Sequence, residues 1–206
     1  SGATVVEAGP VASPAERRAF LDLPYKIQGQ DPNWIAPLRF ERRQHLDPRH
    51  NPWFEHADAE IFVAWRDGRP VGRISAQIDR LAVERDPAAP AQFGMLEALA
   101  GDVSIISALM TAAEGFATSR GKSCLRGPFS LSINDESGLL VDGFDRPPSM
   151  MMGHARPYYA ARLEALGYGK AKDLLAYDID PTVPWPEVTR KLIARAAAGG
   201  VRIRPL

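Results

Sequence analysis

The chain has 206 residues, 45% of them hydrophobic and 24% charged, which are ordinary values for a globular domain and exclude a disordered or fibrous protein. Its 25 Lys and Arg residues balance 25 Asp and Glu residues, so we expect no nucleic-acid partner. No apolar run approaches the ~20 residues of a transmembrane helix. The only cysteine, Cys124, excludes a disulfide framework and indicates a reducing compartment, so we expect a cytoplasmic protein.

The two ends of the sequence predict a natural chain that is longer. It begins at Ser1 without a methionine, so we expect residues 1–12 to be disordered or derived from a tag. Residues 201–204 alternate apolar and basic side chains, which predicts the start of a strand at the other end. We therefore expect one domain over residues 13–180, followed by a linker helix and the start of a second unit over residues 181–206.

The first part of the chain predicts two short helices and a proline-rich loop. Residues 13–16, Ser-Pro-Ala-Glu, form a capping box with Pro at the first helical position, which predicts a helix ending near Leu21. Prolines interrupt residues 23–54, so only residues 38–46 can form another short helix. The aromatic side chains of this stretch either anchor the loop on the core or line a ligand groove.

A hairpin and two crossover units follow in the sequence. Residues 60–66 and 71–78 predict strands joined at Asp67-Gly68, a strong turn signal. The remaining elements are predicted in this order: a strand over residues 92–96, a helix capped by Asp102 and ending near Arg120, a strand over 123–126, an irregular segment over 129–153, a helix over 158–166, a strand over 171–179 and a helix over 187–197. Antiparallel strands come first and crossover-linked strands later, which predicts an α/β (α+β) domain with a mixed sheet and flanking helices.

This order of elements resembles the GNAT acyltransferase fold, in which a coenzyme A thioester donates an acyl group to an amine. The resemblance runs from about Ser13 to Asp180 and implies a mixed, mostly antiparallel central sheet. More specific motifs are similar to a bacterial family of GNAT-like proteins of about twice this length, which bacterial ceramide synthases also resemble: residues 31–34 (Asp-Pro-Asn-Trp), 71–74 (Val-Gly-Arg-Ile), 126–128 (Arg-Gly-Pro) and 138–144. The chain looks like the N-terminal unit of that family.

The resemblance also implies a place for coenzyme A. GNAT proteins hold its pyrophosphate on backbone amides at a helix N-terminus, which corresponds here to the loop that ends at Asp102. We therefore expect Gly101, Asp102 and Gly127 in the cofactor site. The loop departs from the family pattern, because it has one glycine where two small residues are expected and carries carboxylates at Glu97 and Asp102. The tyrosine that often protonates the departing thiolate is replaced by Leu163.

Polar residues in the irregular segment are the candidates for catalysis. Asn134, Asp135 and Glu136 follow a strand end, which is where α/β folds place ligands. We expect Glu136 to deprotonate or anchor an ammonium substrate, Asn134 to orient it, and Tyr159 to contact the ligand. The alternative is that these loop side chains only bond nearby backbone amides.

Other features of the sequence give weaker signals. The four histidines do not have the spacing of metal ligands, so we expect no metal, although His154 is a weaker candidate for a general base. Residues 150–152, three methionines in a row, suit core packing, an interface with a second unit, or a groove for an acyl chain, in that order.

Together these features predict an acyl-CoA-dependent N-acyltransferase of the GNAT superfamily, or its N-terminal lobe. The expected co-substrate is a coenzyme A thioester and the expected acceptor is a small-molecule or lipid amine. We also expect packing against a second GNAT unit or a homodimer. The alternative is a non-catalytic binding or scaffolding lobe whose catalytic unit lies beyond Leu206. Nucleotide hydrolysis ranks last, because only Asp135, Glu136 and Asp142 could hold magnesium.

Overall fold

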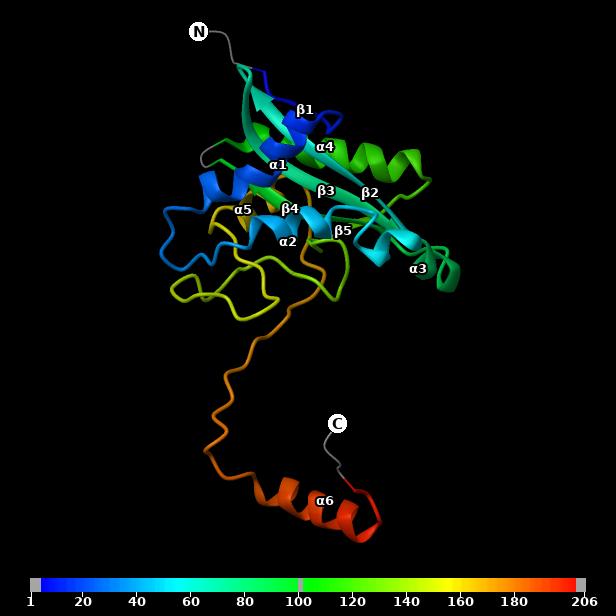
Figure 1. The fold of residues 1–206 in the computed structure, drawn as a ribbon, viewed down its shortest axis with the longest axis vertical. Helices are drawn as coiled ribbons and strands as arrows, with labels where there is room; N and C mark the ends of the chain where they lie inside the picture. The colour runs from blue at the N-terminus through cyan, green and yellow to red at the C-terminus, as the bar shows by residue number, and fades with distance from the viewer. Residues whose placement is uncertain (1–4, 100–101, 203–206) are drawn as a thin grey trace. The chain divides into compact units, whose positions relative to one another are not determined.

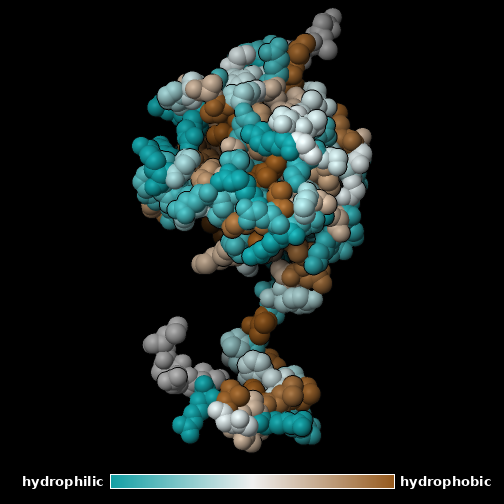
Figure 2. Space-filling view, turned by 90° about the vertical axis from the view of Figure 1, so that its right-hand side faces the viewer, coloured by the Kyte–Doolittle hydropathy of each residue, from teal (hydrophilic) through white to brown (hydrophobic). Residues whose placement is uncertain are grey.

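The computed structural model describes residues 5–99 and 102–202. The chain divides into two units, residues 1–172 and residues 173–206. The first unit contains the sheet and the helices α1 to α5, and the second contains α6 (Glu187–Ala198) (Figure 1). No residue of α6 is buried, and Figure 2 shows apolar side chains exposed along the second unit. The predicted start of a second GNAT unit here stays a prediction.

The sheet has the strand order β1-β2-β3-β4-β5, so each strand pairs with the next strand of the chain. The strands are β1 (Glu7–Pro10), β2 (Ala57–Arg66), β3 (Arg69–Asp79), β4 (Ala91–Ala98) and β5 (Leu125–Arg126). The first four are antiparallel, whereas β5 runs parallel to β4. A parallel pair needs a crossover connection, which α4 (Val103–Ser119) supplies. The predicted mixed, mostly antiparallel sheet with flanking helices is confirmed.

Two layers of helices cover the sheet. The residues Ile74, Ala76 and Ile78 of β3 share one buried cluster with the apolar stripe of α4. Because side chains alternate along a strand, Arg73, Ser75 and Gln77 point to the opposite face. On that face lie α1 (Pro14–Ile27) and α2 (Arg39–His45), visible beside β3 and β4 in Figure 1, and a second cluster that includes Phe20 and Leu23 of α1.

Local sequence signals predicted several elements correctly. In the hairpin turn, Asp67 and Gly68 have φ values of 50° and 70°, the left-handed conformation that an Asp-Gly turn provides. The capping box is present at Ser13, whose hydroxyl accepts a hydrogen bond from the Glu16 amide at 3.2 Å. The predicted helix over residues 158–166 is α5 (Tyr159–Ala165).

The structure corrects other expectations. Residues 7–10 are not disordered, because they form β1 and pair with the edge of β2 at residues 62–65. The first helix does not end near Leu21 but runs to Ile27, since burial of Leu23 and Pro24 against the sheet extends it. No strand forms over residues 171–179, where large apolar side chains such as Leu175 are exposed. Two short helices, α3 (Arg80–Arg85) and the 3-10 helix over residues 52–55, were not predicted.

The segment after β5 is fixed against the middle of the sheet. The Phe129 amide donates a hydrogen bond to the Phe93 carbonyl oxygen at 2.7 Å, and Gln77 Nε2 donates to the Phe129 carbonyl oxygen, also at 2.7 Å. Gly94 allows this approach, because a Cβ atom there would lie 1.7 Å from the Phe129 carbonyl oxygen. The backbone at Phe129 therefore positions the irregular segment that carries Glu136.

No helix in the described parts of the chain has the length and apolar character needed to cross a membrane.

Substituting Gly94 by Ala should destabilise the protein by about 2–4 kcal/mol, because the segment at Phe129 must move away from β4. The matched control is Gly115→Ala in the middle of α4, where a Cβ would meet nothing within 4 Å. That change should stabilise the protein by about 0.5–1 kcal/mol. Urea unfolding of both variants measures the difference, and equal stabilities would contradict the packing described at Phe129.

Candidate functional site

A cluster of charged and polar side chains lies between the sheet and α1. A bulge at Met95, whose φ is 48°, brings Glu97 of β4 opposite Arg73 of β3. Glu97 is 8% exposed, and its Oε2 accepts hydrogen bonds from Gln28 Nε2 and from the Tyr159 hydroxyl, both at 3.0 Å. The C-cap residue of α1 and a residue of α5 therefore meet at one carboxylate of β4, opposite Arg73 of β3, and we name Gln28, Arg73, Glu97 and Tyr159 the Glu97 cluster.

Burial changes the proton affinity of both charged members of this cluster. Burial raises the pKa of Glu97, although the charge of Arg73 and the hydrogen bonds from Gln28 and Tyr159 act in the other direction. Burial also lowers the pKa of Arg73 to about 10, against the favourable charge of Glu97. A carboxyl group whose pKa moves toward neutrality is suited to exchange a proton with a ligand.

Several polar atoms around Glu97 have bonding capacity left over. Four buried atoms make no hydrogen bond within the described residues: Gln28 Oε1, Arg73 Nε, Ser75 Oγ and Gln77 Oε1. Most buried polar atoms in proteins are hydrogen-bonded. A concentration of unsatisfied atoms on α1 and on one face of β3 is what a site for a polar ligand or ordered water provides.

The structure places one of the three predicted catalytic residues in this cluster. Tyr159 is a member, but it is only 1% exposed and its hydroxyl is occupied by Glu97 and the backbone of Ala98. Glu136 forms an ion pair with Arg42 of α2, and its charge acts on both Glu97 and Arg73. Asn134 is exposed in the loop, where its backbone amide donates a hydrogen bond to the Ser132 hydroxyl at 3.1 Å. The catalytic roles of these residues stay predictions.

Asp135, between the two loop candidates, is a structural residue. Its Oδ2 accepts a hydrogen bond from the Ser132 hydroxyl at 2.6 Å, and its Oδ1 lies 3.2 Å from His45 Nε2. Burial raises the pKa of Asp135, but its contacts with His45 and Ser132 outweigh this effect and lower it. Asp135 therefore stays charged and holds the loop, as the alternative interpretation of this segment expects.

The residues predicted to bind coenzyme A lie in two separate places. Asp102 caps α4 by accepting a hydrogen bond from the Ser104 amide at 2.8 Å, and it pairs with Arg66. Gly127 follows β5, where a Cβ would lie 2.3 Å from the Phe93 carbonyl oxygen. Phe93 is roughly 15 Å along β4 from the α4 end of that strand, so the structure does not bring Gly127 and Asp102 together. Gly101 lies outside the described residues.

The described residues of the β4–α4 turn do not fit the pyrophosphate of coenzyme A. The amide and hydroxyl of Ser104 already bind the Asp102 carboxylate, so a negative charge stands at the helix N-terminus. The free edge of β4 is also closed at Ala98, whose amide donates to the Tyr159 hydroxyl at 2.8 Å and whose carbonyl oxygen accepts from the Tyr158 hydroxyl at 2.7 Å. Among the described residues of this turn, the amides of Ala98 and Ser104 are therefore already bonded and not open to a phosphate group.

His154 pairs with a carboxylate that is distant in the sequence, Asp31. His154 Nε2 lies 3.0 Å from Asp31 Oδ2, which also accepts a hydrogen bond from Arg156 at 3.1 Å. The hydrogen bond from His154 is the main cause that lowers the pKa of Asp31. Within residues 5–99 and 102–202, no group of three or more His, Cys, Asp or Glu side chains is arranged to hold a metal ion.

Sequence reasoning missed Gln28, Arg73 and Glu97 as site residues. The alternation over residues 71–78 did indicate a polar face on that strand, but nothing local shows that α1 covers it. Glu97 was assigned to a phosphate loop, where it would repel the ligand. A carboxylate inside an otherwise apolar strand, residues 93–98, was the signal available for a buried functional group.

Comparisons with known proteins identify relatives along almost the whole chain. No family model matches the sequence. The chain is 46% identical over 198 residues to the bacterial ceramide synthase of Caulobacter vibrioides, covering 96% of this chain and 51% of that protein. It is 48% identical over 160 residues to the protein YghO of Escherichia coli, covering 78% of this chain and 40% of that protein. The chain thus spans about half or less of the length of these curated relatives.

A solved structure supports the fold. The aminoglycoside 6'-N-acetyltransferase AAC(6')-IG of Acinetobacter haemolyticus matches with a TM-score of 0.51 at 13% identity, over 84% of this chain and 98% of that one. At this identity the likeness concerns the fold alone. With the sequence relatives, it identifies the chain as a GNAT-fold, acyltransferase-like protein and a homologue of bacterial ceramide synthase over about half of that protein's length, consistent with one unit of a two-unit protein.

Proposed function

We propose that this chain is the N-terminal unit of an N-acyltransferase that joins an acyl group, delivered as a thioester, to a lipid amine. The observation that carries the proposal is the 46% identity to bacterial ceramide synthase over 96% of the chain. A ceramide is an N-acylated sphingoid base, so the proposed acceptor is a sphingoid or similar long-chain amine.

The Glu97 cluster is the proposed receptor for that amine. An amine arrives mostly as an ammonium ion and must lose a proton before its nitrogen can attack a carbonyl carbon. In Glu97, Oε2 is held by Gln28 and Tyr159, while Oε1 makes no hydrogen bond within the described residues. Because burial raises the pKa of this carboxyl, we propose that Glu97 accepts the proton.

The neighbouring charges have supporting roles in this proposal. Arg73 stabilises the carboxylate form of Glu97 and so opposes the rise in its pKa that burial causes, which keeps the carboxylate available to accept a proton. Glu136, whose charge acts on the same cluster, is the proposed anchor for the ammonium ion. Asn134 is exposed at the adjacent loop, and its proposed role remains to orient the acceptor.

We propose that the acyl donor binds outside the described residues of the β4–α4 turn. The GNAT fold implies a coenzyme A thioester as co-substrate. Since Ser104 already binds Asp102 and the tyrosine hydroxyls close the edge at Ala98, we assign these residues no step of the chemistry. We propose that the thioester is held by other residues of the full-length protein and meets the amine at the Glu97 cluster.

A non-catalytic binding or scaffolding lobe is the second candidate function. The bonded amides of Ala98 and Ser104, on the described sides of the β4–α4 turn, favour it, because a unit without a phosphate site needs no open amides there. In that case the Glu97 cluster would be a polar part of the core, and its removal would affect stability rather than acyl transfer.

The variant Glu97→Gln should lower kcat/KM for amide formation by about 100-fold, because glutamine keeps the size of the side chain but accepts no proton. The wild-type rate should fall as the pH drops through the raised pKa of Glu97, since the protonated carboxyl cannot act as a base. The assay is mass-spectrometric detection of ceramide from sphinganine and palmitoyl-CoA, using the full-length natural protein.

Glu84→Gln on α3, which changes an exposed carboxylate, is the control and should retain full activity. If Glu97→Gln keeps more than half of the wild-type rate, the lobe function is favoured instead.

The variant Glu136→Gln separates anchoring from proton transfer. An anchor acts on the bound ammonium ion in the ground state, so we expect KM for the amine to rise by about tenfold with little change in kcat. The same assay with varied sphinganine concentration measures both constants. Unchanged KM and kcat would remove Glu136 from the site, and a large fall in kcat would make it the base in place of Glu97.

A further inference from the structure

A groove lies between α1 and α2, and its wall includes Arg42, whose charge also acts on Arg73 of the Glu97 cluster. Its volume is about 380 Å³, within the range of small-ligand sites. Its walls include five arginines and one tyrosine: Arg17, Arg18 and Tyr25 from α1, and Arg39, Arg42 and Arg43 from α2. The three arginines of α2 have i, i+3 and i+4 spacing, which puts their side chains on one side of the helix.

The carboxylates around the groove neutralise only two of its five arginines. Asp22 pairs with Arg39, and Glu136 pairs with Arg42. The other acidic residue in the groove wall, Asp47, is engaged by Arg49 at 2.7 Å. Glu41 is the acidic residue of α2, but it does not line the groove. Three guanidinium charges of the wall are therefore left to attract an anion.

The three arginines without a carboxylate partner, Arg17, Arg18 and Arg43, differ in their contacts. Arg17 Nη2 donates a hydrogen bond to the carbonyl oxygen of Leu46 at 2.7 Å, a contact that fixes the side chain but leaves its charge. Arg18 and Arg43 are exposed and make no hydrogen bond or ion pair within the described parts of the chain. A planar guanidinium group donates two parallel hydrogen bonds to a phosphate group, so this arrangement suits a phosphate ligand.

One wall of the groove is rigid before any ligand arrives. The Arg39 guanidinium stacks 3.8 Å from the centre of the Tyr25 ring, and the Tyr25 hydroxyl donates a hydrogen bond to the Pro37 carbonyl oxygen at 2.5 Å. These contacts connect α1 to the segment that enters α2. The spacing of the two helices, and hence the width of the groove, is thereby fixed.

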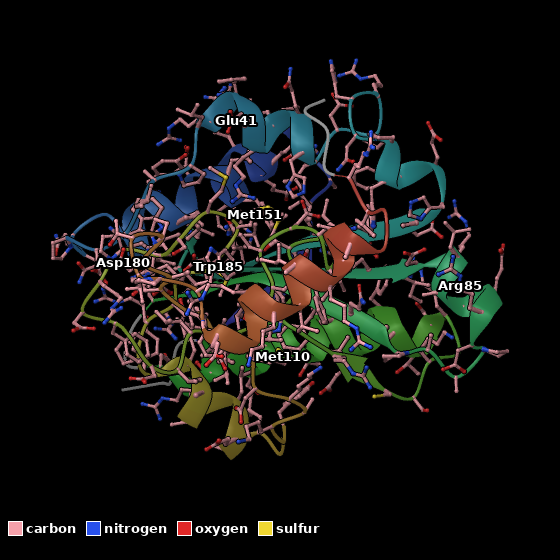
Figure 3. All side chains as sticks on the ribbon, turned by 90° about the horizontal axis from the view of Figure 1, so that it is seen from below. Glu41, Arg85, Met110, Met151, Asp180 and Trp185 are labelled. Carbon is pink, nitrogen blue, oxygen red and sulfur yellow. The ribbon has the colours of Figure 1, made fainter. Side chains whose placement is uncertain are left out.

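Large apolar side chains are exposed next to the groove. Ile35, Leu38 and Phe40 are 60%, 56% and 57% exposed and lie in or just before the first turn of α2. In Figure 3, α2 is marked by Glu41 and lies at the edge of the first unit, with its outer side chains directed away from the sheet. Basic residues beside exposed leucine and phenylalanine are typical of segments that lie in the interface of a lipid bilayer.

We propose that the α1–α2 groove docks this unit on an anionic phospholipid surface. Arg17, Arg18 and Arg43 bind lipid phosphate groups, and Leu38 and Phe40 enter the apolar boundary below them. The positive charge of the groove and the apolar side chains beside it both select a membrane surface over a free anion. The inference stands without the proposed acyltransferase function, although a long-chain amine acceptor would be found at such a surface.

Vesicle sedimentation tests the proposal with the 206-residue chain. We expect binding to phosphatidylcholine vesicles that contain phosphatidylglycerol, no binding to phosphatidylcholine alone, and loss of binding at high salt. The double variant Arg18→Glu/Arg43→Glu should weaken binding by at least ~10-fold, since each basic residue near an anionic surface contributes about fivefold. The matched control Arg69→Glu/Arg85→Glu makes the same change in net charge at exposed positions at the start of β3 and on α3, and it should bind as the wild type does.

Three results would overturn the proposal. Unchanged vesicle binding in Arg18→Glu/Arg43→Glu would show that the groove is not the contact. Equal loss in the control variant would show that net charge alone governs binding. Binding of inorganic phosphate in a calorimetric titration, without binding to anionic vesicles, would assign the groove to a free phosphorylated ligand. Circular dichroism of each variant checks the fold, and the variant Phe40→Ser, which keeps every charge, should also weaken vesicle binding.

Discussion

The burial of two opposite charges, Arg73 and Glu97, at facing positions of β3 and β4 is the constraint on which the site depends. Two opposite charges on adjacent strands lie under α1, where each loses contact with water. Such a pair is stable only when hydrogen bonds complete it, and Gln28 and Tyr159 supply them from α1 and α5. The Glu97 cluster therefore connects the helices on one face of the sheet to the helix that ends the domain. The same burial that makes the pair costly gives Glu97 a raised pKa.

Elements with strong local signals could be predicted from the sequence. The hairpin could be predicted because Asp67-Gly68 sets the turn by its own backbone preference, and α4 could be predicted because its apolar stripe repeats over 17 residues. Elements that depend on a partner distant in the sequence could not be predicted. Residues 7–10 form β1 because β2 offers an edge with which they pair, whereas residues 171–179 have an apolar pattern but pair with no strand of the described chain.

The site was harder to predict than the fold for a physical reason. The alternation of Arg73, Ser75 and Gln77 is the same whether that face of β3 meets water or a helix, and only α1 decides between them. The loop candidates Asn134 and Glu136 were found because polar residues after a strand end are visible locally. The structure then gives them different surroundings: Glu136 interacts with the buried charges, and Asn134 remains exposed. The arginines along α1 and α2 are visible in the sequence, but nothing local shows that the two helices form a groove between them.

The most direct test of the central claim is whether this unit binds an amine. Calorimetric titration of the 206-residue chain with sphinganine, kept below micelle formation, should give saturable binding above neutral pH. On acidification through the raised pKa of Glu97, the carboxylate is lost and binding should weaken by at least ~10-fold. A folded sample that binds no amine, or binds it equally at both pH values, would contradict the assignment of the Glu97 cluster as the amine site.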